Sequence, residues 1–227
     1  MKTLVIFLAI IMAASAAFSK GLLMQSLNFP METDDSYVKV QPNKPMGLTA
    51  FTLCAKILTD AGGVLSIFSY ATQNHNNELL LGRETNGKFS LHLSGPPVLF
   101  DASMAQVGWT PLCVTWESKT GMTALWVNGT RSVRKKYQTG RTLEAGGVII
   151  LGQDQDNVQG GFQKKECFIG EMTDIHLWDY ILVPSEIRQR SRKSINPRGN
   201  VIDWNTMKYE AKGTVIVSPS DIYPQQN

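Results

Sequence analysis

The stretch Pro111-Leu112-Cys113-Val114-Thr115-Trp116-Glu117-Ser118 alternates apolar and polar side chains, which is the period-two pattern of a half-buried β-strand. Leu112, Val114 and Trp116 would share one face of that strand, and Cys113 would lie on the other. Residues 51–57 repeat the pattern, with Cys54 opposite the apolar set. Neighbouring strands of this kind could bring the two cysteines together across one face of a sheet.

Similar short strands recur along the chain, with Gly, Pro, Asn and Asp between them. Asn128-Gly129 is a strong hairpin signal, because both positions tolerate a positive φ. A single helix is expected from Pro184, which suits the first helical turn, to about Arg192, and the tail from Ser218 onward is expected to be loosely ordered. The pattern predicts an all-β sandwich or jelly roll of antiparallel sheets with one short helix. The expected strands are 37–40, 51–57, 64–70, 78–81, 88–93, 112–117, 123–127, 148–151 and 175–178.

The bulk composition limits the classes of protein. A chain of 227 residues with 43% hydrophobic content can form one core and one domain. A net charge of +3 without a concentrated basic stripe gives no reason to expect specific nucleic-acid binding. Residues 1–17 combine Lys2, an apolar run at 4–12 and Ala14-Ser15-Ala16, which is the pattern of a secretory signal peptide. We therefore expect a mature extracellular domain at 18–227 and no membrane span, since the apolar run is too short for one.

Two further features leave alternatives open. Cys167 is the third cysteine, and in an oxidising compartment it could be a buried free thiol or a link between two protomers. Asn128-Gly129-Thr130 is an N-glycosylation sequon at an expected hairpin tip, although Asn-Gly also serves the turn alone.

Five motifs follow one another along the chain: Cys-x-Thr-Trp-x-Ser at 113–118, Ile150-Leu151-Gly152-Gln153-Asp154-Gln155-Asp156, Gly160-Gly161-Phe162, Gly170-Glu171 and Trp178-Asp179. In this order they resemble the pentraxin family, over residues 27–219. The resemblance implies a jelly-roll sandwich of the concanavalin A or laminin-G type. It also implies a disulfide between Cys54 and Cys113, which would stabilise the fold by about 4 kcal/mol through closure of a long loop.

The resemblance further implies two calcium ions per protomer. Taken from the residues alone, Asp-x-Asp followed by amides and an acid is a weak calcium signal that a solvated turn would also give. This chain departs from the family pattern at Asn76, where an acid is usual, so the first site should be weaker. The acid and amide usual at 163 and 166 are exchanged, which preserves the charge of the second site. The first ion would be bound by Asn76, Asn77, Asp154, the carbonyl of Gln155 and Asp156, and the second by Asp154, Asp156, Gln163 and Glu166.

In the family, the calcium ions anchor phosphate or carboxylate groups of the ligand. Choline-binding members add an apolar contact and a carboxylate; here Gly82 and His92 stand at the apolar and neighbouring polar positions, and Pro97 stands at the carboxylate position. None supplies the expected chemistry, and Glu84 is the nearest acid that could substitute. We expect calcium-dependent binding of anionic groups, such as phospholipid headgroups or microbial glycans, without a clear basis for choline recognition.

The resulting hypothesis is a secreted, calcium-dependent pattern-recognition protein of innate immunity, not an enzyme. Display on a homopentamer would strengthen weak single sites, and complement or phagocyte receptors would be its effector partners. The alternatives are an extracellular laminin-G-like adhesion or matrix module, and a jelly-roll glycoside hydrolase using Asp154 and Asp156. The basic clusters at 134–136 and 188–193 could bind a polyanion or a partner, or form a solvated face.

Overall fold

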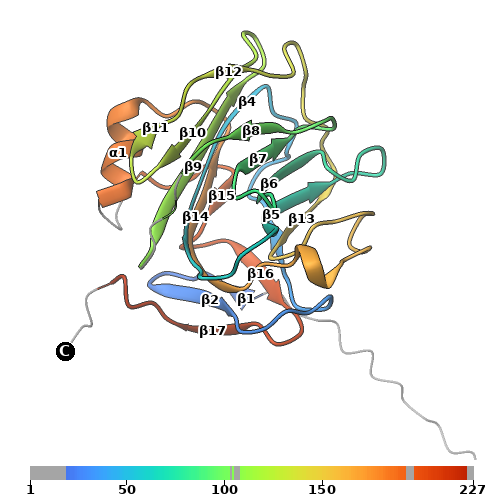
Figure 1. Ribbon diagram of the computed structural model, residues 1–227, viewed down its shortest axis with the longest axis vertical. Helices are drawn as coiled ribbons and strands as arrows, with labels where there is room; N and C mark the ends of the chain where they lie inside the picture. Colours follow the sequence, from blue (N-terminus) through green and yellow to red (C-terminus); the bar gives the residue numbers. More distant parts are fainter. Residues whose placement is uncertain (1–18, 103, 105–107, 193–196, 224–227) are drawn as a thin grey trace, which may run out of the picture.

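The computed structural model describes residues 19–102, 104, 108–192 and 197–223, so the expected signal peptide lies outside the described residues. Two antiparallel sheets pack face to face and one short helix lies on the outside of one of them (Figure 1). The predicted all-β sandwich is therefore confirmed. Among the described residues, no helix has the length and apolar character needed to cross a bilayer.

The first sheet has eight strands and carries the loops of the expected calcium site. Its order is β1 (Ser19–Lys20), β16 (Lys208–Ala211), β3 (Val38–Gln41), β13 (Val148–Leu151), β5 (Leu65–Ala71), β6 (Leu79–Arg83), β7 (Phe89–His92) and β8 (Val98–Phe100).

The second sheet has nine strands and carries the disulfide and the helix. Its main path is β11 (Thr130–Arg131), β10 (Met122–Val127), β9 (Thr110–Glu117), β4 (Ala50–Leu58), β14 (Gly170–Trp178), β2 (Gln25–Phe29) and β17 (Ile216–Pro219). In addition, β12 (Lys135–Lys136) pairs with β10 and β15 (Ile202–Asp203) pairs with β14. The helices are η1 (Lys164–Glu166) and α1 (Pro184–Arg192), and α1 has the bounds that the sequence predicts.

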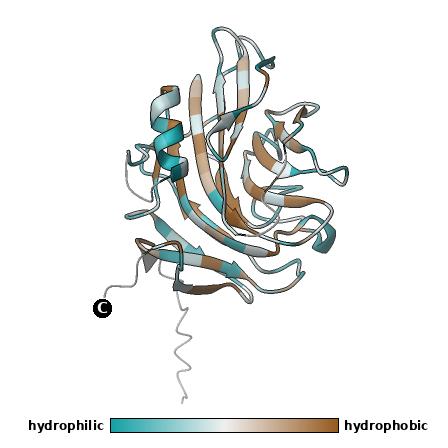
Figure 2. Ribbon diagram, turned by 60° about the vertical axis from the view of Figure 1, so that its left-hand side comes forward, coloured by the Kyte–Doolittle hydropathy of each residue, from teal (hydrophilic) through white to brown (hydrophobic). Residues whose placement is uncertain are grey.

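The core lies between the two sheets and follows the period-two pattern. Leu112, Val114 and Trp116 of β9 are buried in it. Figure 2 shows brown, hydrophobic stretches along the strands and a mostly teal, hydrophilic α1. Cys54 and Cys113 belong to a second, smaller apolar cluster, which lies beneath α1 and includes Trp126, Trp178, Leu182 and Ile187. The helix α1 thus covers the outer face of β4 and β9, which is the face opposite their main apolar side chains.

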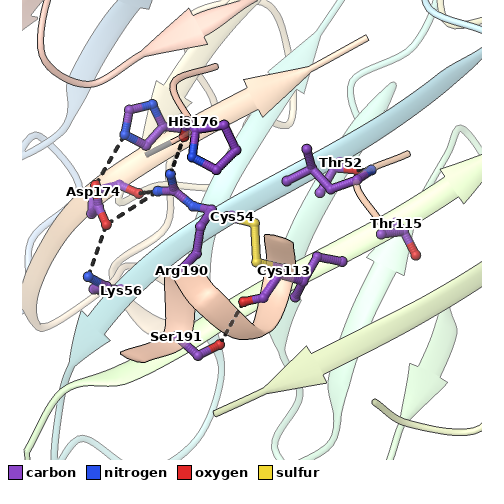
Figure 3. Close-up of a disulfide and its surroundings, with 12 residues drawn as sticks. Thr52, Cys54, Lys56, Cys113, Thr115, Asp174, His176, Arg190 and Ser191 are labelled. Atoms are coloured by element: carbon purple, nitrogen blue, oxygen red, sulfur yellow. Dashed lines mark hydrogen bonds and ion pairs between the residues drawn. A yellow bond between two sulfur atoms is a disulfide. The ribbon is translucent and has the colours of Figure 1, made fainter. Parts of the chain in front are cut away.

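Cys54 and Cys113 stand directly opposite each other in the β4–β9 pair and form a disulfide, as the family resemblance implies (Figure 3). Cys167 is buried and forms no disulfide, so it is the buried free thiol of the two alternatives. Burial also raises the pKa of this thiol, which keeps it protonated and unreactive.

Removing the disulfide should cost about 4 kcal/mol of unfolding free energy, because the bond closes a loop with a sequence separation of 59. The test is urea unfolding of the Cys54→Ala/Cys113→Ala double variant. Cys167→Ala is the control, since it removes a thiol without opening the loop. An unchanged unfolding midpoint in the double variant would contradict a stabilising role.

A buried group of charges ties α1 to the sheet beside the disulfide (Figure 3). Asp174 accepts from three cations or donors: Lys56 Nζ lies 3.0 Å from Oδ2, Arg190 Nη2 lies 3.3 Å from Oδ2, and His176 Nε2 lies 3.1 Å from Oδ1. Asp174 has a φ of +57°, at a point where the β4–β14 register shifts. The bulge turns its carboxylate toward α1, from which Arg190 reaches it. The solvated-face interpretation of the 188–193 cluster is therefore wrong for Arg190.

The described part of the chain end, residues 218–223, differs from the expected loosely ordered tail, of which residues 224–227 lie outside the described residues. Ser218 and Pro219 belong to β17, which pairs with β2, and the backbone N–H of Ser220 donates to the carbonyl of Met24. Tyr223 is buried. The segment from 216 to 223 is ordered because its hydrogen-bond partners lie near the other end of the chain, which no local pattern reveals.

The Asn128-Gly129 hairpin is confirmed, with φ values of +50° and +75° between β10 and β11. Asn128 is exposed there, and its glycosylation stays a prediction.

Candidate metal centre

Gln155 positions the loop that carries the two central carboxylates. This loop leaves β13 and folds back over β5, where the buried Gln155 donates from Nε2 to the carbonyls of Ser69 (3.2 Å) and Val148 (3.1 Å). Its own Oε1 accepts from the backbone of Gln159 at 2.9 Å. The side chain is therefore a bridge between loop and sheet, a role that the sequence pattern did not suggest.

The Gly160-Gly161 turn brings the second half of the loop back toward the first. Gly161 has a φ of +73°, and a Cβ there would stand 2.5 Å from Cβ of Asp156, so only glycine fits. Gln163 then lies against Asp156, with Nε2 donating to Oδ2 at 2.7 Å. Glu166 follows at the end of η1. The structure therefore brings together the acids and the amide expected at the second site.

Asp154 is the residue of this group whose pKa the neighbouring carboxylates shift most clearly. Burial and the nearby charges of Glu166 and Asp156 raise its pKa to about 6. The carboxylate of Glu84, just past the end of β6, raises it as well. Oxygen Oδ1 of Asp154 is buried without a hydrogen-bond partner. A carboxylate in these surroundings is repelled by its neighbours and has one buried oxygen without a donor, and a divalent cation would relieve both costs.

Asn77 supplies a second buried oxygen without a partner, its Oδ1, from the loop before β6. Asn76 is exposed and accepts from the backbone of Asn77 at 3.0 Å. The order β13-β5-β6 places this loop near the strands on which Gln155 rests. No three His, Cys, Asp or Glu side chains in the described ranges converge tightly enough to form a ready-made metal site. The donor chemistry nevertheless fits calcium, which prefers carboxylate, amide and carbonyl oxygens.

Glu78 and Arg141 hold the Asn76-Asn77 loop, and the sequence reasoning missed both. Glu78 is fully buried; its Oε2 lies 2.5 Å from Arg141 Nη2, and its Oε1 accepts from the backbone of Glu144 at 2.7 Å. Ser94 joins them, donating its hydroxyl to Glu78 and its backbone N–H to the carbonyl of Asn77. An acidic residue at the first buried position of a strand was the available signal, because buried carboxylates need partners.

Glu144 makes a second tie to the same loop. Its Oε2 accepts from Asn74 Nδ2 at 3.0 Å and from Thr72 Oγ1 at 3.1 Å. These hydrogen bonds, of which the one from Asn74 has the largest effect, lower the pKa of Glu144 and keep it ionised. The loop before β6 is thus fixed from within the protein, while Oδ1 of Asn77 keeps no partner among the described residues.

Of the residues expected to contact choline, Gly82 lies on β6, His92 on β7 and Glu84 just past the end of β6, and Glu84 and His92 are the two that meet. His92 Nε2 lies 3.8 Å from Oε1 of Glu84. Burial lowers the pKa of His92, and Glu84 partly offsets this. Gly82 lies between them on β6, and a Cβ there would approach the carbonyl of Leu65 to 2.7 Å, which disfavours any larger residue. Pro97 is exposed in the loop before β8.

Comparison with known proteins agrees with this architecture. The Pentaxin family model matches residues 25–219. The chain is 37% identical to C-reactive protein of Sus scrofa over 223 residues, covering 96% of this chain and 98% of the relative. It is 38% identical to serum amyloid P-component of Mus musculus over 192 residues, covering 84% and 85%.

Among solved structures, a native heptameric SAP-like pentraxin from Limulus polyphemus has a TM-score of 0.79 at 24% identity, covering 88% of this chain and 97% of that one. Domains LG4-5 of the mouse laminin α1 chain have a TM-score of 0.53 at 15% identity, covering 73% and 44%. Both likenesses concern the fold alone, whereas the family model and the curated relatives decide the assignment. The chain belongs to the pentraxin family, whose C-reactive protein and serum amyloid P members are recognition proteins and not enzymes.

Proposed function

We propose that this chain is a secreted, calcium-dependent pattern-recognition protein of innate immunity that displays its sites on a homo-oligomeric ring, a pentamer in our hypothesis. The observation that carries the proposal is Asp154, a half-buried carboxylate with one buried, unpartnered oxygen and three further carboxylates nearby. Secretion is supported by the signal pattern of residues 1–17. Recruitment of complement or phagocyte receptors is proposed from family membership.

Asp154 and Asp156 would bind both of the proposed calcium ions. Asn76, Asn77 and the carbonyl of Gln155 would complete the first site, and Gln163 and Glu166 the second. When bound, calcium supplies a positive anchor for phosphate or carboxylate oxygens of a ligand. Because single contacts of this kind are weak, a ring that presents several on one face would bind a polyvalent surface far more tightly than a monomer.

The experiment that tests this proposal is a phospholipid and glycan array, run with and without a chelator on protein of measured solution mass. The expected result is capture of phosphate- or carboxylate-bearing ligands that disappears on chelation. Capture that persists without calcium would overturn the mechanism. Capture of extended matrix glycans by a monomer would instead favour the laminin-G-like adhesion alternative.

The surroundings of Gly82 predict a preference for phosphoethanolamine over phosphocholine. Glu84 and His92 offer polar partners for an N–H donor, while Gly82 offers no apolar surface to a trimethylammonium group. A hydrogen bond to a charged acceptor is worth about 1.5–3 kcal/mol, so we expect about tenfold tighter binding of phosphoethanolamine.

Competition calorimetry in saturating calcium measures this ratio. Glu84→Gln should reduce it several-fold, and Glu117→Gln, on the other sheet, should leave it unchanged. Tighter binding of phosphocholine by the natural chain would show that the subsite has another chemistry.

A further inference from the structure

We propose that a hollow between β10 and α1 binds a single-chain fatty acid, with the alkyl tail among apolar side chains and the carboxylate on Arg131 and Arg134. The hollow lies on the outer face of the nine-stranded sheet, whereas the loops of the candidate metal centre belong to the eight-stranded sheet. The inference therefore goes beyond the proposed function and does not depend on calcium.

The register of β9 and β10 creates the hollow. Cys113 and Trp126 stand opposite each other and belong to the apolar cluster beneath α1. Two residues along each strand, on the same face, Thr115 stands opposite Ala124. Because both side chains are small, they leave space that larger residues would fill. The hollow they help to line has a volume of about 480 Å³, within the range of small-molecule sites.

Apolar side chains form most of the wall. Trp126 comes from β10, Leu182 from the loop before α1 and Ile187 from α1 itself, and all three are buried. Met122 and Ile181 also line the hollow but are 45% and 39% exposed. Figure 1 shows α1 beside β10 and β11. An alkyl chain lying between the helix and the sheet would remove the exposed apolar surface of Met122 and Ile181 from water.

Two arginines line one rim of the hollow. Arg131 pairs with Trp126 in the β10–β11 ladder, and its guanidinium lies over the indole ring at 5.8 Å. Arg134 precedes β12, in which Lys135 pairs with Thr123 of β10. Both arginines are exposed, and no carboxylate contacts either of them in the part of the chain that the structure describes. A guanidinium can bind a carboxylate through two parallel hydrogen bonds, so this rim suits an acidic head group.

Glu117 gives the ligand a direction. It is the one acid among the described lining residues, and it accepts from Thr120 Oγ1 at 2.8 Å. Glu117 ends β9 and Met122 begins β10, so both lie at the turn between these strands. Arg131 lies toward the other end of β10. A carboxylate would be repelled at the turn and attracted at the rim, so the tail should point toward Met122.

The lining selects this class of ligand over others. A sugar needs free polar groups, yet the Thr115 hydroxyl on the floor already donates to the carbonyl of Ala124 at 3.4 Å. A polyanion would pair the two arginines but leave Met122 and Ile181 in water. A neutral lipid would cover the apolar wall but offer no charge to the guanidiniums. One alkyl chain with one negative charge satisfies both surfaces.

The test is a fluorescence titration of the full secreted chain with dansyl-labelled undecanoate, a fatty acid whose emission rises in an apolar site. We expect saturable binding of one molecule per protomer, equal in calcium and in chelator. Dodecanoate should displace the probe at about tenfold lower concentration than dodecanol, which has the same chain without the charge.

Arg131→Gln/Arg134→Gln should weaken binding of the probe about tenfold and remove the advantage of dodecanoate over dodecanol. The matched control is Arg188→Gln/Arg192→Gln, which neutralises two exposed arginines of α1 that do not line the hollow. It should change neither quantity, because the overall charge falls equally in both variants.

Ala124→Leu fills the floor of the hollow and should abolish binding of the probe. Ile181→Ser keeps the test decisive if that variant folds poorly, since Ile181 is exposed, and it should weaken binding several-fold. Four results would each overturn the inference: no saturable binding by the natural chain, equal displacement by dodecanol, unchanged binding by Arg131→Gln/Arg134→Gln, or binding that chelator abolishes. The last would assign the probe to the metal centre.

Discussion

Asp154→Asn is expected to remove calcium binding at both sites and yet to make the calcium-free protein more stable. The carboxylate is a proposed ligand of both ions, so its loss should weaken calcium binding at least 100-fold, since ligand charge sets the affinity of such sites. Without calcium, the same negative charge destabilises the folded protein, because it is partly buried and lies near other carboxylates. Its pKa of about 6 lies above the ordinary value of 3.8, and at 1.36 kcal/mol per pH unit the difference corresponds to about 3 kcal/mol.

The sign of the pH dependence follows from this difference. A raised pKa in the folded state means that the folded protein binds the proton more tightly than the unfolded chain. The stability of the calcium-free protein is therefore greatest below about pH 4 as far as this group is concerned, and it falls as the pH rises through about 6. Asp154→Asn should abolish that decline, because the amide carries no charge at any pH in this range.

Calorimetric titration with calcium and urea unfolding in chelator at pH 4 and pH 7.5 measure both effects. Asp34→Asn, a change at an exposed aspartate, is the matched control and should alter neither. A full calcium heat from Asp154→Asn would contradict the assignment of this residue. A loss of stability in chelator would contradict the argument from repulsion.

Asp174→Ala should destabilise the protein by about 3–5 kcal/mol, the largest loss we expect from a single substitution outside the apolar core. It would leave Lys56 and Arg190 buried without the carboxylate that now contacts both. Removing one partner of a buried ion pair is costly because the other charge remains desolvated. Arg190 would also lose its only carboxylate partner among the described residues and keep just the Asp174 carbonyl and the Trp178 ring on β14, so α1 should loosen over the disulfide.

Lowering the pH should cause part of the same loss of stability, because it protonates Asp174. Although burial alone would raise the pKa of Asp174, the hydrogen bond with His176 and the charges of Arg190 and Lys56 hold it well below the ordinary value. A carboxylate with a lowered pKa contributes stability above about pH 4 and loses it as the pH falls through the folded-state pKa. The acid unfolding limb of the natural chain should therefore flatten in Asp174→Ala.

Urea unfolding at pH 7 tests the size of the loss. Asp174→Asn separates charge from backbone, since Asn also tolerates the φ of +57° and any remaining loss then reflects the missing charge. Asp101→Ala removes an exposed partner of Lys88 and should cost less than about 1 kcal/mol, as surface pairs do. A loss from Asp174→Ala no larger than from Asp101→Ala would show that the cluster does not stabilise the fold.

The glycoside hydrolase alternative falls with the family assignment, and the choice of calcium over catalysis for Asp154 and Asp156 remains a proposal. Of the residues expected at the metal sites, those of the loop 154–166 come from the family resemblance, because the Asp-x-Asp pattern alone is a weak calcium signal, and their binding of calcium stays a prediction. The proximity of Glu84 to Asp154 could not be predicted from the sequence, because Glu84 lies some seventy residues before Asp154. The strand order β13-β5-β6 brings the two charges near each other.

The sequence by itself determined the sandwich, the helix at 184–192, and the position of Cys54 and Cys113 on the strand faces opposite the apolar stripes, because alternation and turn residues are local properties. Tertiary structure alone decided that residues 216–219 form an edge strand, that Arg190 turns inward to Asp174, and that Glu78 and Arg141 brace the Asn76-Asn77 loop. Each of these depends on a partner distant in the chain. The edge strand depends on backbone hydrogen bonds with β2, and the two ion pairs depend on charges that are buried together, so all three exist only once the two sheets have closed.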